Sequence, residues 1–128
     1  MYSNYPILYL AFHGEPGKIH LSKRKKRSLE DIASIISGSC ANRVIIFSSC
    51  SVLRANQKFI SEFLKKTGAL AVIGYKSNVD WIRSVALDLL LIETLQNYEF
   101  SGRGLKGIGP CVKNLAKQFS DLDLHMLT

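Results

Sequence analysis

The sequence predicts an α/β fold in which a core sheet of three parallel strands is flanked by helices. Three short apolar runs, rich in β-branched residues, have the character of buried strands: Tyr5–Phe12, Arg43–Ser48 and Ala69–Ile73. Segments with a helical spacing of apolar residues separate and follow these runs. This alternation is typical of parallel sheets with right-handed crossovers and helices on both faces. With 128 residues, 47% of them hydrophobic, the chain is sized for a single domain spanning residues 1–128.

The first strand leads into a short polar region before the first helix. Pro6 suits the start of that strand, and residues 13–17 are predicted to form a turn. Residues 18–21 alternate polar and apolar side chains and indicate a short hairpin strand. A loop at 22–27 follows, and it holds five consecutive basic residues, Lys23–Arg27.

Four helices are predicted. The first begins at a capping box, Ser28-Leu29-Glu30-Asp31, and ends at Gly38. The others are expected at Asn56–Lys66, Asp80–Gln96 and Pro110–Phe119, with Pro110 in the first turn of the last helix. In the second helix the core stripe is assigned to Phe59, Ile60, Phe63 and Leu64. In the longest helix the apolar face is assigned to Ile82, Val85, Ala86, Leu89 and Leu90, with Ile92 and Leu95 beside them. The final residues, 121–128, receive no assignment.

Charge and cysteine content bear on compartment and partners. The net charge of +7 permits contact with nucleic acid, but no aromatic residues interleave the basic run and no binding motif accompanies it. A nucleic-acid partner is therefore not favoured, and Lys23–Arg27 is interpreted as a solvated loop, a nucleic-acid contact or an exposed processing site. No signal peptide or membrane span is indicated. Three cysteines without C-x-x-C spacing favour reduced thiols in a cytoplasmic protein, with no metal site. The glycine-rich segment 101–109 lacks phosphate-loop spacing, and we expect no cofactor.

A histidine and a cysteine follow two of the predicted strands. His13-Gly14 comes after the first strand and Cys50 after the second, so both are expected at the carboxyl edge of the sheet. A neighbouring imidazole can turn a thiol into a nucleophilic thiolate. The backbone N–H groups of Gly14 and Cys50 would be placed to stabilise an oxyanion. The alternative is that Cys50 is a buried structural thiol and His13 a turn residue.

The residues around this pair resemble a known family. Tyr9-Leu10-Ala11-Phe12-His13-Gly14, followed by Ile45-Ile46-Phe47-Ser48-Ser49-Cys50-Ser51, resembles the caspase-like cysteine peptidases, nearest to their CHAT-type bacterial branch. The resemblance continues through Gly68–Gly74 and Val79-Asp80-Trp81 and covers roughly residues 5 to 97. It implies a three-layer α/β sandwich in which His13 is the general base or acid, Cys50 the nucleophile and the Gly14 N–H an oxyanion donor.

Two departures from the family pattern matter. The family domain usually has a β-α-β portion before the histidine strand, and this chain begins almost at that strand. The truncated sheet would have an open edge, which favours a homo-oligomer, such as a dimer, or a partner that completes the sheet. Several family members also carry an Asp two residues before the Cys to bind a basic side chain, and this chain has Ser48 there. Asp80 is a further candidate for the substrate pocket, although a helix N-cap before Trp81 is the favoured role for it.

The resemblance therefore implies a hydrolase, a cysteine endopeptidase that cleaves a polypeptide through a Cys-His dyad. The alternative is a truncated, non-catalytic caspase-like module that acts by protein association.

Overall fold

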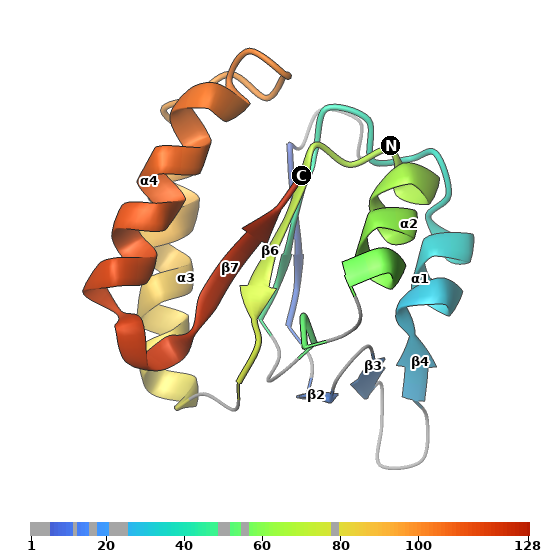
Figure 1. Cartoon of the computed structure of the whole chain (residues 1–128), viewed down its shortest axis with the longest axis horizontal. Coiled ribbons are helices and arrows are strands. Elements are labelled where there is room, and N and C mark those ends of the chain that lie inside the picture. Colours follow the sequence, from blue (N-terminus) through green and yellow to red (C-terminus); the bar gives the residue numbers. More distant parts are fainter. Residues whose placement is uncertain are drawn as a thin grey trace.

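The structure is a computed structural model that describes residues 6–11, 13–15, 18–20, 26–48, 52–54, 57–77 and 80–128, with the backbone alone described at 13–15, 20 and 81. These residues form an α/β fold with helices on both faces of a four-stranded sheet (Figure 1). The strands are β1 (Ile7–Leu10), β2 (His13–Glu15), β3 (Lys18–His20), β4 (Lys26–Ser28), β5 (Val44–Phe47), β6 (Ala71–Tyr75) and β7 (Leu124–Leu127). The helices are α1 (Leu29–Ile35), α2 (Gln57–Thr67), α3 (Trp81–Leu95) and α4 (Leu105–Gln118), and the 3₁₀ turn η1 spans Ser120–Leu122.

The main sheet has the strand order β1-β5-β6-β7. The three predicted strands pair in parallel, with Leu10 opposite Phe47 and Phe47 opposite Gly74. β7 adds a fourth strand, antiparallel to β6, which the sequence analysis did not assign. The sheet is therefore mixed rather than wholly parallel, and β1 and β7 form its edges.

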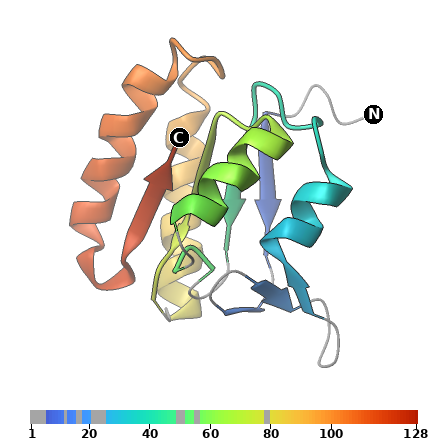
Figure 2. The ribbon, with the colours of Figure 1, turned by 45° about the vertical axis from the view of Figure 1, so that its right-hand side comes forward.

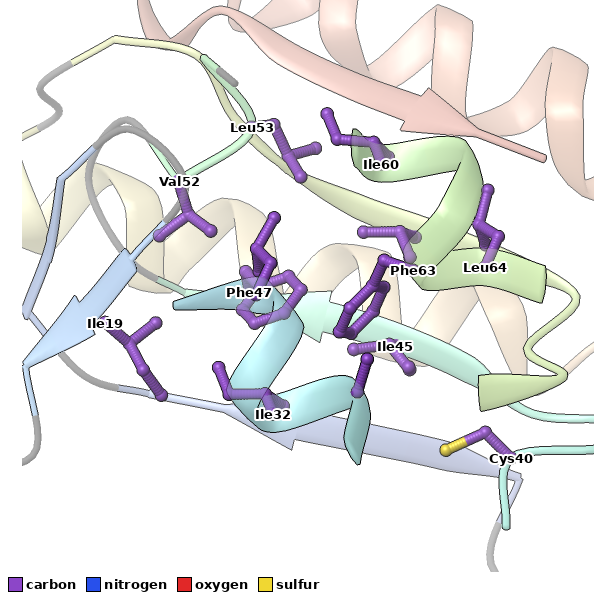
Figure 3. Packing of buried hydrophobic residues seen from close by; sticks show 13 residues of the cluster. Ile19, Ile32, Cys40, Ile45, Phe47, Val52, Leu53, Ile60, Phe63 and Leu64 are labelled. Atoms are coloured by element: carbon purple, nitrogen blue, oxygen red, sulfur yellow. The ribbon is translucent and has the colours of Figure 1, made fainter. Parts of the chain in front are cut away.

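β5 is the centre of the molecule because it is buried on both faces. Ile45 and Phe47 face a core that α1 and α2 cover, while Val44 and Ile46 face a core that α3 and α4 cover. Figure 2 shows α2 in front of the sheet and α3 behind it. The close-up in Figure 3 shows Phe47 beside Phe63 of α2, and their ring centroids are 5.8 Å apart. A continuous apolar run is what a strand covered on both faces requires.

α1 begins as predicted. The Ser28 hydroxyl accepts from the Asp31 N–H, and the Asp31 carboxylate accepts from the Ser28 N–H, which completes the capping box. α2 has Ile60, Phe63 and Leu64 in the core, but Phe59 is 50% exposed, so the predicted core stripe is wrong at that position.

Two predictions for the polar region before α1 are corrected by the structure. Residues 13–15 form β2, which pairs with β3, rather than a turn. Lys26 and Arg27 of the basic run lie in β4, which also pairs with β3, while residues 21–25 lie outside the described part of the chain. These strands form a small three-stranded sheet in which β3 is the middle strand and pairs antiparallel with both β2 and β4.

α4 begins earlier than predicted, so Pro110 lies inside the helix and not in its first turn. A proline there leaves the carbonyl four residues before it without a helical partner. Pro110 and Lys106 are both exposed, so solvent can hydrate that carbonyl. The glycine-rich segment supplies the first turns of α4 and packs closely, because a Cβ on Gly107 would lie 2.5 Å from the Tyr98 ring.

The buried face of α3 is largely the opposite of the predicted one, although Leu95 and the half-buried Ile92, which were assigned beside the predicted face, do contact the core. The helix faces the core with Leu87, Leu91 and Leu95, together with the polar Ser84 and Asp88. The residues assigned to its apolar face, Ile82, Val85, Ala86, Leu89 and Leu90, are exposed. The pattern is ambiguous because α3 carries apolar residues on both sides, and a polar interaction, described next, decides the orientation.

Candidate functional site

The carboxyl ends of β1 and β5 lie side by side. Leu10 is the register partner of Phe47, and the Ser48 N–H donates to the Leu10 carbonyl at 2.8 Å, which extends the ladder by one residue. His13 and Cys50 each follow this register pair by three residues in the chain. The chain therefore leaves β1 and β5 at the same edge of the sheet.

The structure describes the predicted catalytic residues in part. His13 and Gly14 lie in β2, opposite His20 and Ile19, and only their backbone is described. Cys50 lies outside the described residues. The His13–Cys50 dyad therefore stays a prediction. Because Gly14 belongs to the ladder with β3, an oxyanion role requires its N–H to point away from Ile19.

The described residues before and after Cys50 are each held by a backbone hydrogen bond. Ser48 holds the upstream side through its bond to Leu10. On the downstream side, the Leu53 N–H donates to the Tyr75 carbonyl at 3.2 Å, and Val52 and Leu53 are fully buried (Figure 3). The Leu53 side chain lies over Gly74, where an added Cβ would approach it to 3.1 Å. The chain around Cys50 is therefore tied to the ends of three strands.

A buried carboxylate lies beneath this edge. Asp88 of α3 is 1% exposed, and it accepts hydrogen bonds from the hydroxyls of Ser48 (2.5 Å), Tyr75 (2.7 Å) and Tyr9 (2.8 Å). Ser48 and Tyr9 donate to one carboxylate oxygen and Tyr75 to the other. The Tyr75 hydroxyl also lies 3.1 Å from the Ser84 carbonyl. We call these four residues, Tyr9, Ser48, Tyr75 and Asp88, the Asp88 cluster.

The electrostatics of the cluster keep its phenols protonated. Burial, followed by the Asp88 charge and hydrogen bond, raises the pKa of Tyr75 far above its usual value. Burial also raises the pKa of Tyr9, with the Asp88 hydrogen bond and charge acting in the same direction against the effect of Ser48. Both residues therefore remain O–H donors to Asp88 at neutral pH, as a buried carboxylate requires.

The two residues predicted to bind substrate have structural partners. The Ser48 hydroxyl is engaged with Asp88. Asp80 is the N-cap of α3, and its carboxylate accepts from the N–H groups of Ile82 (2.9 Å) and Arg83 (3.4 Å). The N-cap alternative for Asp80 is therefore observed.

The Asp88 cluster was not predicted from the sequence. Its signal was a lone acidic residue inside the apolar run from Val85 to Ile92, because a carboxylate in such a run needs buried donors. The available donors were Tyr9, inside the first predicted strand, and Tyr75, two residues after the third. Tyr9 and Tyr75 each lie on the α3 side of the sheet.

A second polar group lies at the start of β7. Asp123, which has a positive φ of 54°, accepts from the Ser77 hydroxyl at 2.9 Å and pairs with His125 Nε2 at 2.7 Å. The hydrogen bond to His125 is the main cause that lowers the pKa of Asp123. Asp123 contacts both Ser77 and His125, whereas a catalytic triad needs the histidine between the hydroxyl and the acid. These three residues are therefore not arranged as a triad.

The described residues include two free cysteines, Cys40 and Cys111. Cys40 is buried, and Cys111 Sγ lies 2.8 Å from the Tyr98 hydroxyl. Within the described residues, no group of three or more His, Cys, Asp or Glu side chains is arranged to hold a metal ion. Nor does that part of the chain include a helix with the length and apolar character to cross a membrane.

Residues 1–101 match the model of a protein family described as a family of unknown function, DUF6642. The chain belongs to this family. No curated protein and no solved structure matches the chain.

Proposed function

We propose that this domain is a caspase-like cysteine peptidase in which His13 and Cys50 form the catalytic dyad. The observation that carries the proposal is the register of β1 with β5, since Leu10 opposite Phe47 leaves both residues the same number of positions beyond one edge. The double anchoring of the Cys50 segment, at Ser48 and at Leu53, supports it. A nucleophile needs such a supported position.

The chemistry follows from the two side chains. The His13 imidazole takes the thiol proton, and Cys50 Sγ attacks the scissile carbonyl carbon. The resulting oxyanion is stabilised by backbone N–H groups, with Gly14 as one donor. As the tetrahedral intermediate collapses, the imidazolium gives its proton to the leaving amine. Water then hydrolyses the thioester and releases the acid, which regenerates the thiol.

The specificity of the proposed peptidase is not directed to basic side chains. A carboxylate does lie near the strand end, but it comes from α3. Asp88 is 1% exposed, and its oxygens already accept three hydroxyl hydrogen bonds. It therefore supports Ser48 rather than offering a free carboxylate to a substrate. We further propose a cytoplasmic location, because a reduced nucleophile and the free thiols of Cys40 and Cys111 suit a reducing compartment.

Thiol labelling tests the dyad. At pH 7, iodoacetamide should alkylate Cys50 faster than Cys111, which contacts Tyr98, and much faster than the buried Cys40. The His13→Ala variant should lose the difference, whereas His125→Ala serves as the matched control and should keep it. Mass spectrometry of tryptic peptides measures each rate. Equal rates at Cys50 and Cys111, or an unchanged Cys50 rate in His13→Ala, would refute the proposal.

The second candidate function is protein association without catalysis. In the part of the chain that the structure describes, no strand pairs with the outer edge of β1. β1, Ile-Leu-Tyr-Leu, carries no charge that would discourage pairing with another chain. If the purified protein cleaves no member of a random peptide library, and Cys50 shows no enhanced reactivity, this candidate replaces the peptidase.

A further inference from the structure

The outer face of α3 is an apolar surface without a partner in the described structure. Leu89 is 65% exposed, Ile82 64%, Leu90 41% and Val85 40%. Ala86 is also exposed and lies among them. We call these five residues the α3 stripe. Four of the seven large hydrophobic residues identified as exposed in the described structure belong to it.

A helix with apolar residues on both sides is normally buried on both sides. The inner side of α3 is occupied, because Leu87, Leu91 and Leu95 pack in the core beneath it. On one flank, Arg83 lies over the Phe119 ring and pairs with Asp121, which ties α3 to the region after α4. The α3 stripe borders this flank and is exposed in the described structure, so only the inner side of α3 is covered by packing.

The spacing of the exposed residues indicates a helix as the occupant. Ile82, Val85, Leu89 and the half-buried Ile92 are separated by three, four and three residues. This is the spacing of the seam along which two helices pack with knobs into holes. The stripe is formed by one continuous helix, so a second helix can lie along its whole length.

The charges indicate that the second helix is α3 of another copy. The chain carries a net charge of +7, yet the α3 stripe contains no basic residue, so two copies can meet there without repulsion between lysines or arginines. Exposed Glu93 lies at one end of the stripe and Arg83 beside the other. In an antiparallel pair, Glu93 of one protomer approaches the Arg83 side chain of the other, which is 49% exposed while it keeps its bond to Asp121. The two-fold axis repeats this contact.

We propose that the protein forms a two-fold symmetric dimer in which two α3 stripes pack as antiparallel helices. Such an interface is self-complementary, because each stripe meets its own copy. In this pairing Val85 and Leu89 lie near the centre of the interface, and Ile82 of each protomer lies near Glu93 of the other at its two ends. The interface is independent of the proposed dyad and of the outer edge of β1.

Substitution of Leu89 tests the surface. The full chain should sediment as a dimer at tens of micromolar in analytical ultracentrifugation, and Leu89→Glu should raise the dimer dissociation constant at least about 100-fold, because it places two carboxylates in the apolar seam. Ile35→Glu on α1 is the matched control, since Ile35 is 73% exposed on another face, and it should leave the dimer intact. Circular dichroism should show that both variants keep their helical content. A monomeric wild type, a dimeric Leu89→Glu or a monomeric Ile35→Glu would overturn the proposal.

Disulfide trapping tests the antiparallel register. Ile82→Cys mixed with Glu93→Cys should form a crosslinked heterodimer under mild oxidation, because these positions meet in the antiparallel pair. Ile82→Cys alone should crosslink slowly with itself, since its two copies lie at opposite ends. Mass spectrometry of the linked peptides identifies the bond. Faster self-linking of Ile82→Cys, or no link between positions 82 and 93 in a protein that is still dimeric, would overturn the antiparallel arrangement.

Discussion

The Asp88 cluster predicts a large difference between two chemically identical substitutions. Tyr75→Phe and Tyr9→Phe each remove one hydroxyl that donates to the same carboxylate. Tyr75 is fully buried, whereas Tyr9 is 38% exposed. The chemical change is therefore matched, while the two sites differ in the access of water and in whether the carboxylate oxygen keeps a second donor.

The magnitude follows from what each substitution leaves behind. In Tyr75→Phe, one oxygen of Asp88 loses its donor in a site that water does not reach. A hydrogen bond to a charged group contributes about 1.5–3 kcal/mol, and a buried unsatisfied acceptor has a comparable cost. We therefore expect the free energy of unfolding to fall by about 2–3 kcal/mol. In Tyr9→Phe, the other oxygen keeps its bond to Ser48 and water can replace the phenol, so the loss should stay below about 1 kcal/mol.

Urea unfolding monitored by circular dichroism measures both losses. The urea midpoints should shift, while the slope of the free energy of unfolding against urea concentration should change little, since the surface exposed on unfolding is nearly the same. Because the proposed dimer would add a concentration term, all variants must be compared at one protein concentration. Equal losses for the two variants would refute the reasoning, and so would a Tyr75→Phe protein as stable as the wild type.

Three further predictions concern pH and packing. The unfolded Tyr75 phenol ionises near its usual pKa of 10.0 while the folded phenol stays protonated, so the folded state binds more protons above that pH. The free energy of unfolding should therefore fall as pH rises above about 10, and Tyr75→Phe should make this fall shallower by about 1.4 kcal/mol per pH unit. Asp123 has a lowered pKa in the folded state, so its contribution to stability is present above its unfolded pKa of 3.8 and lost as pH falls below it. Asp123→Asn should flatten the acid limb of the stability profile measured by thermal melts, and an unchanged limb would contradict this assignment. Gly74→Ala should cost about 1–3 kcal/mol, because its Cβ would lie 3.1 Å from the Leu53 side chain, whereas Gly102→Ala, with nothing within 4 Å, should change stability by less than about 1 kcal/mol. Similar urea midpoints for the two glycine variants would show that Leu53 moves freely.

The strand and helix pattern was largely predictable because each element carries a local signal. Val44–Phe47 is a short apolar run, and it is buried on both faces as predicted. The capping box at Ser28 and the N-cap at Asp80 likewise depend on side chains next to the backbone they bond. The class of the fold follows from the order of such elements.

What the sequence did not reveal depends on distant residues. β7 is four residues long and gains its place by pairing with β6, about fifty positions earlier in the chain. Pro110 is tolerated inside α4 because it lies on an exposed side, which the local sequence does not show. The candidate site shows the same limit. His13 and Cys50 were identifiable from strand ends, while the Asp88 cluster joins residues from β1, β6, α3 and the end of β5.

The orientation of α3 connects the candidate site with the proposed interface. Its two sides are both apolar, so hydrophobic burial alone barely distinguishes them. Turning the helix over would expose Asp88 and remove the acceptor of the buried Tyr75 hydroxyl, at about 1–3 kcal/mol, together with that of the half-buried Ser48 hydroxyl. The polar cluster therefore selects the inner face. The same choice leaves the α3 stripe outside, so the carboxylate that supports the end of β5 also determines which surface is available to a second copy.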